Sequence, residues 1–180
     1  MKKTQRIALV SIMGALALIF SILKLEVPFP VLTYLKFDLA EIPSFIAFFL
    51  CGLGCGSATA IIHFVGLLFR GSDPLGASMK LAAVLSTIIG MKASKTLYGQ
   101  IVFGTISRVL VMTIANAIYF YLIFPEYILY IENILSANGI GGGMLTVFVL
   151  TGIFNMIHSI FSITVSWKIV NETKKRINLD

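Results

Sequence analysis

The sequence predicts an all-α integral membrane protein with six transmembrane helices and both termini in the cytoplasm. Three observations support this. The chain is 58% hydrophobic and only 12% charged, whereas an ordinary soluble domain has roughly 25% charged residues. Basic clusters stand at both ends of the chain. Four long runs lack Asp, Glu, Lys and Arg, namely Ile7–Leu23, Ile42–Phe69, Val109–Pro125 and Asn133–Trp167. Several match or exceed the ~20 residues that cross a bilayer.

The helices are assigned in order along one domain, residues 1–180. The uncharged run 42–69 would be about 42 Å long as one helix, which is too long for one comfortable crossing. Three glycines in CGLGCGS (51–57) mark a turn that divides it. The predicted spans are about 6–23, 39–54, 57–70, 76–92, 98–124 and 144–170.

The charges set the predicted orientation. With six spans, nine of the fourteen Lys and Arg residues lie in the cytoplasm, and six of the eight acidic residues lie outside. This agrees with the preference of Lys and Arg for cytoplasmic loops. Five spans would place one terminal basic cluster outside. Because the basic residues gather at membrane boundaries, the net charge of +6 does not indicate a nucleic-acid partner.

Two outer loops are long enough to carry function. Loop 24–38 contains two prolines, aromatic residues and charges, and loop 125–143 ends in three consecutive glycines. Loops of this content are more often lids or binding loops than plain connections. We expect the first to act as a lid, since it is too apolar for a disordered connector.

Motifs for enzymatic chemistry are missing. GMKASKT (90–96) lacks the glycine that a phosphate-binding loop needs directly before its lysine, and HExxH and G-x-S-x-G are not found. Cys51 and Cys55 are too few for a metal site, and we expect them to be small packing residues. The sequence predicts neither an enzyme nor a metal protein.

Polar residues inside spans are costly in lipid, so each is a candidate functional residue. They are His63, Arg108, Asn116, Asn155 and His158. Asn155 and His158 share a helix face and, like Asn116, fall in the outward half of a span; we expect these three to line a pocket. Hydrogen bonding between helices is the alternative role for each. We expect His63 to serve that alternative, and Arg108 to pair with a backbone carbonyl or to extend towards the cytoplasm.

The first span carries a stripe of small residues, Ala8, Ser11 and Ala15. Small residues at this spacing allow another helix to approach closely. The stripe fits either a partner protein or packing within the chain.

The charges in YLKFDLAEIP (34–43) fit the start of a helix. Asp38 with Glu41 three positions later resembles a capping box, and either residue could be the cap. We expect Phe37 and Asp38 to border the ligand, because they join the lid-like loop to the pocket.

Four stretches resemble the S components of energy-coupling factor (ECF) transporters, and most closely their riboflavin-binding branch. They are the Ala8–Ala15 stripe, LKFDLAEIPSFIAFFLCGLGCG (35–56), RVLVMTIAN (108–116) and FNMIHS (154–159). S components are prokaryotic six-span proteins of the cell membrane that bind vitamins for uptake. The resemblance implies that the stripe contacts a shared membrane subunit carrying two cytoplasmic ATPases. These would use the ATP, and the chain would need no cofactor of its own.

The resemblance also implies that loop one covers the pocket and that Asn116 and Asn155 bind the substrate. One position departs from the riboflavin branch, which usually has Asn-x-x-Lys where this chain has Asn155 and His158. Thiamine, cobalamin or a similar vitamin therefore remains an alternative to a flavin. A small self-sufficient transporter is the alternative outside the family, although no internal repeat is visible.

Overall fold

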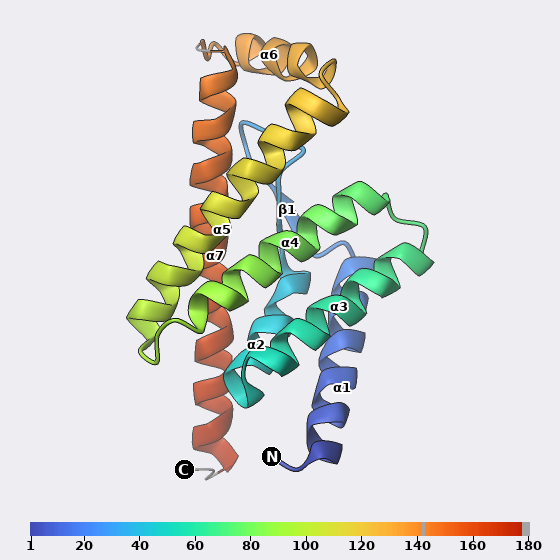
Figure 1. Cartoon of the computed structure of the whole chain (residues 1–180), viewed down its shortest axis with the longest axis vertical. Coiled ribbons are helices and arrows are strands. Elements are labelled where there is room, and N and C mark those ends of the chain that lie inside the picture. Colours follow the sequence, from blue (N-terminus) through green and yellow to red (C-terminus); the bar gives the residue numbers. More distant parts are fainter. Residues whose placement is uncertain (142, 178–180) are drawn as a thin grey trace.

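A computed structural model describes residues 1–141 and 143–177 of the chain. Among these residues the regular secondary structure is helical apart from one two-stranded hairpin (Figure 1). The elements are α1 (Lys3–Ile22), β1 (Glu26–Pro28), β2 (Lys36–Asp38), the 3-10 turn η1 (Leu39–Glu41), α2 (Ile42–Cys51), α3 (Leu53–Phe69), α4 (Pro74–Met91), α5 (Leu97–Ile118), the π-helical turn η2 (Tyr119–Ile123), α6 (Tyr127–Ala137) and α7 (Gly143–Ile177).

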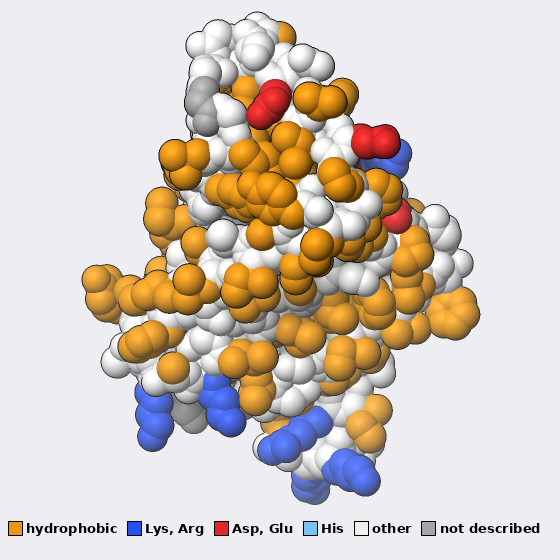
Figure 2. Space-filling view, turned by 45° about the horizontal axis from the view of Figure 1, so that its top comes forward, with side chains coloured by type: hydrophobic (Ala, Val, Ile, Leu, Met, Phe, Trp, Pro, Cys, Tyr) orange, Lys and Arg blue, Asp and Glu red, His pale blue; other side chains and the backbone are white. Residues whose placement is uncertain are grey.

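The helices form one bundle in which α7 runs the length of the molecule beside α2 and α5. Helices α1, α2 and α3 pack together, and α4 lies between α3 and α5. Both termini lie at one end, which we call the terminal end; α6 crosses the opposite end, which we call the α6 end (Figure 1). Hydrophobic side chains cover much of the surface between the two ends (Figure 2). Most Lys and Arg side chains visible on that face lie at the terminal end, whereas the acidic ones lie towards the α6 end.

Local sequence explains where several helices begin and end. Asp73 caps α4 by accepting a hydrogen bond from the Gly76 amide at 2.6 Å, and Pro74 follows at the first helical position. Thr96 caps α5 in the same way, through the Gly99 amide. Between α2 and α3 the chain turns at Gly52, whose φ of 87° favours glycine.

The turn at Gly52 also corrects our expectation for the two cysteines. Cys51 and Cys55 are paired as a disulfide across the turn, with their Cα atoms 5.8 Å apart. The sequence analysis expected both to be small packing residues. The pair joins the last residue of α2 to the first turn of α3.

Helices lie over all six predicted spans, and four of them are long and apolar enough to cross a membrane: α1, α4, α5 together with η2, and α7. Helices α2 and α3 are apolar but shorter. Segment 125–143, which we predicted as a long outer loop, instead folds over most of its length as helix α6. Ile131 and Leu135, one turn apart, are buried there against Phe120 and Val147.

The expected lid, loop 24–38, is an ordered antiparallel hairpin. Val27 of β1 pairs with Phe37 of β2, and the connecting segment buries Leu32 in the apolar cluster beneath α6. A second cluster fills the bundle between α2, α4 and α7 and includes Phe45, Ile88 and Ile163. The main cavity lies between the two clusters.

Candidate substrate-binding site

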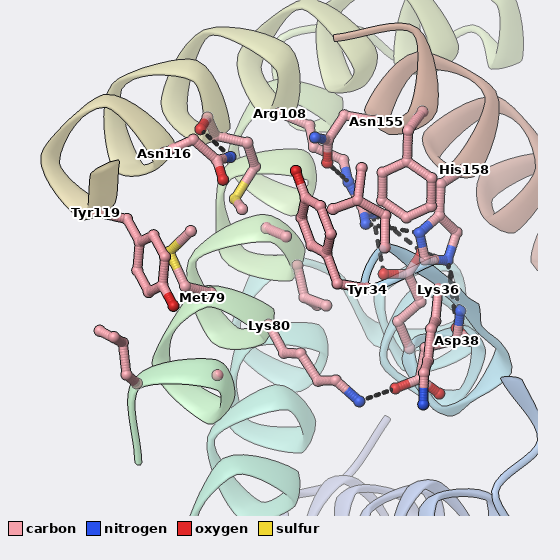
Figure 3. Close-up of a pocket in the computed structure, with 18 of the residues that line it drawn as sticks. Tyr34, Lys36, Asp38, Met79, Lys80, Arg108, Asn116, Tyr119, Asn155 and His158 are labelled. Atoms are coloured by element: carbon pink, nitrogen blue, oxygen red, sulfur yellow. Dashed lines mark hydrogen bonds and ion pairs between the residues drawn. The ribbon is translucent and has the colours of Figure 1, made fainter. Parts of the chain in front are cut away.

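A cavity of about 340 Å³ opens among β2, α4, α5 and α7, with Tyr127 of α6 at one end. This is in the range of cavities that hold small-molecule ligands, roughly 300–1,000 Å³. Of the sequence-predicted binding residues, Asp38, Asn116, Asn155 and His158 line it (Figure 3). The helices bring these side chains together from three separate parts of the chain.

Arg108 of α5 is the centre of a buried hydrogen-bond network on the cavity wall (Figure 3). Its Nη1 donates to both carboxylate oxygens of Glu41, at 3.0 and 2.9 Å, and its Nε donates to Asn155 Oδ1 at 3.2 Å. The Arg108 and Glu41 side chains are only 3% and 7% exposed. The expectation that Arg108 pairs with a backbone carbonyl or extends out of the bundle was therefore wrong, because a carboxylate lies within reach across the helix interface.

His158 of α7 completes this network with both ring nitrogens. Its Nδ1 lies 3.0 Å from Arg108 Nη2. Because a guanidinium only donates hydrogen bonds, Nδ1 must be the acceptor and carry no proton. The proton of the neutral ring is then on Nε2, which lies 3.1 Å from Glu41 Oε1, 3.3 Å from the Asp38 carbonyl oxygen and 3.2 Å from the Asp38 amide nitrogen. The contact with Arg108 therefore assigns His158 as the neutral Nε2–H tautomer, whose protonated Nε2 faces Glu41 and cannot accept from the Asp38 amide.

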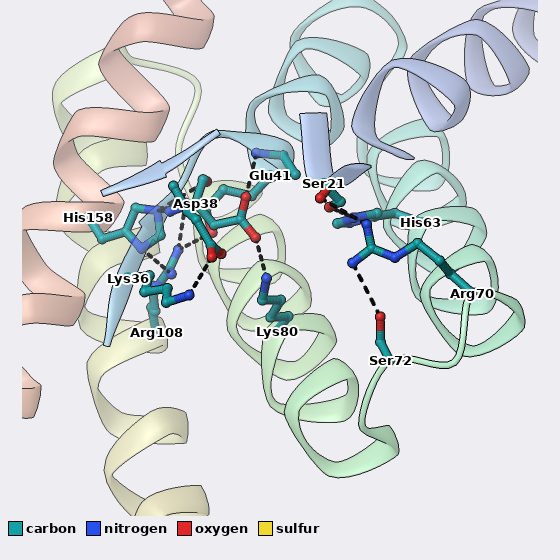
Figure 4. Close-up of polar contacts among 12 residues, drawn as sticks. Ser21, Lys36, Asp38, Glu41, His63, Arg70, Ser72, Lys80, Arg108 and His158 are labelled. Atoms are coloured by element: carbon teal, nitrogen blue, oxygen red, sulfur yellow. Dashed lines mark hydrogen bonds and ion pairs between the residues drawn. The ribbon is translucent and has the colours of Figure 1, made fainter. Parts of the chain in front are cut away.

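Asp38 links the hairpin to the helices on either side of the cavity. One carboxylate oxygen accepts from the Ala40 amide at 2.9 Å, which caps η1, and the other pairs with Lys80 of α4 (Figure 4). Burial opposes ionisation of Asp38, but Lys80 and the Ala40 amide outweigh it and hold the pKa of this carboxyl below its usual value. Asp38 is thus the cap, whereas Glu41 turns to Arg108.

The two asparagines keep hydrogen-bonding capacity for a ligand. Each donates one amide proton to the carbonyl four residues earlier on its own helix, Asn116 to Met112 and Asn155 to Thr151. Asn155 Oδ1 faces Arg108, which fixes the orientation of its amide group. Within the described part of the chain Asn116 Oδ1 accepts no hydrogen bond. The cavity therefore presents an amide acceptor at Asn116 and a free amide proton on each asparagine.

Aromatic rings form much of the rest of the wall. Tyr34, Tyr119, Tyr127 and Phe154 line the cavity. The Tyr34 hydroxyl is buried and has no hydrogen-bond partner among the described residues. Burial raises the pKa of Tyr34 to about 12, so the hydroxyl stays neutral and can donate to a ligand. Phe37 does not line the cavity; it packs behind the wall, with its ring 4.9 Å from that of Phe154 and 5.4 Å from that of His158.

The remaining candidate residues lie away from the cavity, except His63. Ala8, Ser11 and Ala15 are exposed on one face of α1. His63 reaches the cavity edge, but its Nε2 is hydrogen-bonded to Ser21 of α1 at 2.7 Å (Figure 4), which is the bonding between helices expected for it. The sequence analysis missed the roles of Glu41, Lys80 and Tyr34. A lysine inside the predicted span 76–92 was a visible signal that we did not count among the polar residues.

Comparison with known proteins identifies the family. The profile described as "ECF transporter, substrate-specific component" matches residues 5–169. The chain belongs to this family. It is a membrane protein that binds a transport substrate and not an enzyme, as the sequence analysis predicted.

A curated relative and a solved structure agree with this assignment. The chain is 26% identical to the riboflavin transporter RibU of Staphylococcus aureus (strain TCH60) over 170 residues, 89% of this chain and 85% of the relative. Its fold matches a solved structure described as the S component of a bacterial ECF transporter, with a TM-score of 0.73 and 21% identity over 98% of this chain and 99% of the other. At 21% identity, this match shows that the two proteins share a fold.

Proposed function

We propose that this S component binds riboflavin or a related flavin from outside the cell and delivers it inwards with the help of ATP-driven partner subunits. The observation that carries the proposal is the cavity itself, which joins Asn116 and Asn155 under an ordered loop one. The likeness to a curated riboflavin transporter favours a flavin over other vitamins.

The chemistry of the cavity suits a flavin ring system. A flavin has flat apolar faces and an edge that carries an imide N–H between two carbonyl groups. Aromatic side chains of loop one, η2 and α6 can contact the faces. The free acceptor of Asn116 suits the imide N–H, and the free amide proton of Asn155 suits a ring carbonyl. His158 stands where the riboflavin branch has lysine, and both of its nitrogens face protein groups.

The same proposal sets the orientation in the cell membrane. The basic terminal end faces the cytoplasm, the α6 end faces outwards, and the short helices α2 and α3 complete six crossings. The exposed stripe Ala8, Ser11 and Ala15 is the contact face for a shared coupling subunit that carries two ATPases. ATP is used on those subunits, and this chain has no cofactor of its own.

Ligand binding is tested with the purified protein in detergent. Riboflavin fluorescence should be quenched stoichiometrically, without ATP, when the ring enters the aromatic cavity. Absence of quenching at micromolar riboflavin would exclude a flavin as the substrate. Mass spectrometry of small molecules that co-purify with the protein, followed by titration with thiamine or cobalamin, would then identify the vitamin.

Asn155 provides the sharpest single-residue test of this site. Asn155→Ala should weaken riboflavin binding by about 1–3 kcal/mol, because a ligand carbonyl loses its donor in a buried site. The measurement is the dissociation constant from fluorescence titration. Asn133→Ala, at an exposed position of α6, is the matched control and should bind as the wild type does. Equal affinities for both variants would place the ligand elsewhere.

The partner face is tested separately from binding. Ala15→Trp should leave riboflavin binding unchanged but abolish uptake by cells that contain the complete transporter, because a bulky side chain prevents close approach of the coupling subunit. Ile114→Trp, at a 61% exposed position on α5, is the matched control and should support uptake. Normal uptake by the Ala15 variant would show that the coupling subunit binds another face.

A further inference from the structure

Every Lys and Arg side chain that lines the cavity is already paired with a carboxylate. The pairs are Lys36–Glu26, Lys80–Asp38 and Arg108–Glu41. A fourth carboxylate, Asp73, also lines the cavity and caps α4 through the Gly76 amide. Within residues 1–141 and 143–177, the wall therefore contains four carboxylates against three Lys or Arg side chains.

We propose that this pairing makes the cavity selective for the uncharged form of its vitamin and excludes the phosphate ester of the same molecule. The inference rests on the proposed function and specifies it: the substrate is riboflavin and not its 5′-phosphate, FMN. Glu41 is the specificity-determining residue at the buried part of the wall, and Asp38 has the same role at the more exposed part.

The buried part of the wall shows how the pairing would act. An unpaired arginine in a buried cavity is a strong phosphate site, because its fork of N–H groups matches phosphate oxygens. Here both carboxylate oxygens of Glu41 accept hydrogen bonds from Arg108 Nη1. The other guanidinium nitrogens, Arg108 Nε and Nη2, face Asn155 and His158. A phosphate would have to displace this carboxylate or lie beside it. An uncharged ligand needs neither.

Two further groups that usually attract anions are also neutralised. The positive end of α4 lies on the cavity wall, and a helix N-terminus is a common phosphate site. Asp73 occupies it, since its carboxylate accepts the Gly76 amide proton at 2.6 Å. His158 is held neutral, because its Nδ1 must accept from Arg108. At the mouth of the cavity the positive charge of Lys80 is neutralised as well. Its side chain is 44% exposed but is paired with Asp38.

The wild-type protein provides the first test. Riboflavin and FMN titrations are compared at pH 8, well above the ordinary imidazole pKa of about 6.5. FMN should bind about tenfold more weakly or worse, because like charges placed together oppose binding. Equal or tighter FMN binding would overturn the inference and leave the proposed function intact. Failure of riboflavin itself to bind would overturn both.

Two pairs of variants test the cause. Glu41→Gln and Asp38→Asn each expose one cation, and at least one of them should narrow the preference for riboflavin by about tenfold. The double variants Glu41→Gln/Arg108→Gln and Asp38→Asn/Lys80→Gln remove the cation as well and should restore the preference. If no single variant narrows it, the pairing is not its cause. The wild-type comparison and the Asp38 pair decide the question even if the Glu41 variants do not fold.

Discussion

Two regions of the same helix pair, α5 and α7, are built on opposite principles. Towards the terminal end the helices are close-packed, and a side chain added at Gly104 would lie 2.9 Å from Met91 and 3.1 Å from Ile163. One turn further along α5, the residue between the helices is Arg108 instead of a glycine. Its guanidinium contacts Asn155 and His158 of α7 through hydrogen bonds. The first region holds the helices together by contact, whereas the second holds them by charge and hydrogen bonds around a cavity.

The difference shows what a cavity demands of a membrane protein. Close packing stabilises helices in lipid, where apolar side chains gain little from leaving water. A ligand cavity removes that packing, so other interactions must hold the wall in place. The Arg108 network does this, because it ties Glu41 at the start of α2 to α5 and α7. The wall should therefore depend on charge balance, and the packed region on side-chain volume.

The largest effect should come from breaking the buried ion pair. Arg108→Met leaves Glu41 as a buried carboxylate without its counter-ion and should cost about 3–5 kcal/mol of unfolding free energy. Thermal unfolding in detergent measures the loss. The double variant Glu41→Gln/Arg108→Met should recover much of it, since no uncompensated charge remains. A single-variant loss below 1 kcal/mol would show that the wall does not depend on this pair.

The packed region should respond to volume instead. A Cβ atom at Gly90 of α4 would lie 2.3 Å from the backbone oxygen of Phe103 on α5, and a backbone atom cannot rotate away. Gly90→Ala should therefore lower the unfolding free energy by about 1–3 kcal/mol without changing the ratio of riboflavin to FMN affinity. Gly152→Ala is the control, because its Cβ would meet nothing within 4 Å. Equal unfolding temperatures for the two variants would contradict close packing of α4 against α5.

Sequence patterns predicted the helices better than the loops. Long uncharged runs and the glycines near residue 52 indicated most of the helices, since both signals are local. Helix α6 was missed although Tyr127, Ile131 and Leu135 follow a four-residue spacing typical of a helix face. The segment was predicted as a loop because three consecutive glycines at 141–143 disfavour a helix, and this signal outweighed the spacing before them.

In the binding site, too, local signals were predictable from the sequence and contacts between distant residues were not. Cost in lipid was sufficient to select Asn116, Asn155 and His158, and the fold brings all three to one cavity. The partner of Arg108 could not be predicted, because Glu41 is 67 residues away in the chain and only tertiary packing joins them. Capping rules alone could not decide whether Asp38 or Glu41 caps the helix. In the structure Asp38 is the cap, because Glu41 accepts hydrogen bonds from Arg108.

The smallest effect should come from the partly exposed Lys80–Asp38 pair at the mouth of the cavity. Asn caps helices about as well as Asp, so Asp38→Asn removes the charge paired with Lys80 but keeps the cap. The Asp38 side chain is only 11% exposed, but that of Lys80 is 44% exposed. Lys80 can therefore keep its charge in water when Asp38 loses its own, and the loss at pH 7 should be about 1 kcal/mol or less.

The pH dependence of unfolding separates charge from capping. The folded pKa of Asp38 is depressed from 3.8, so the pair stabilises the fold above that pH and loses its contribution as the pH falls through the folded pKa. Wild-type and Asp38→Asn unfolding temperatures should therefore differ at pH 7 and converge in strong acid. A constant difference across this range would assign the effect to the cap, and a loss as large as that of Arg108→Met would contradict the contrast between the partly exposed and buried pairs.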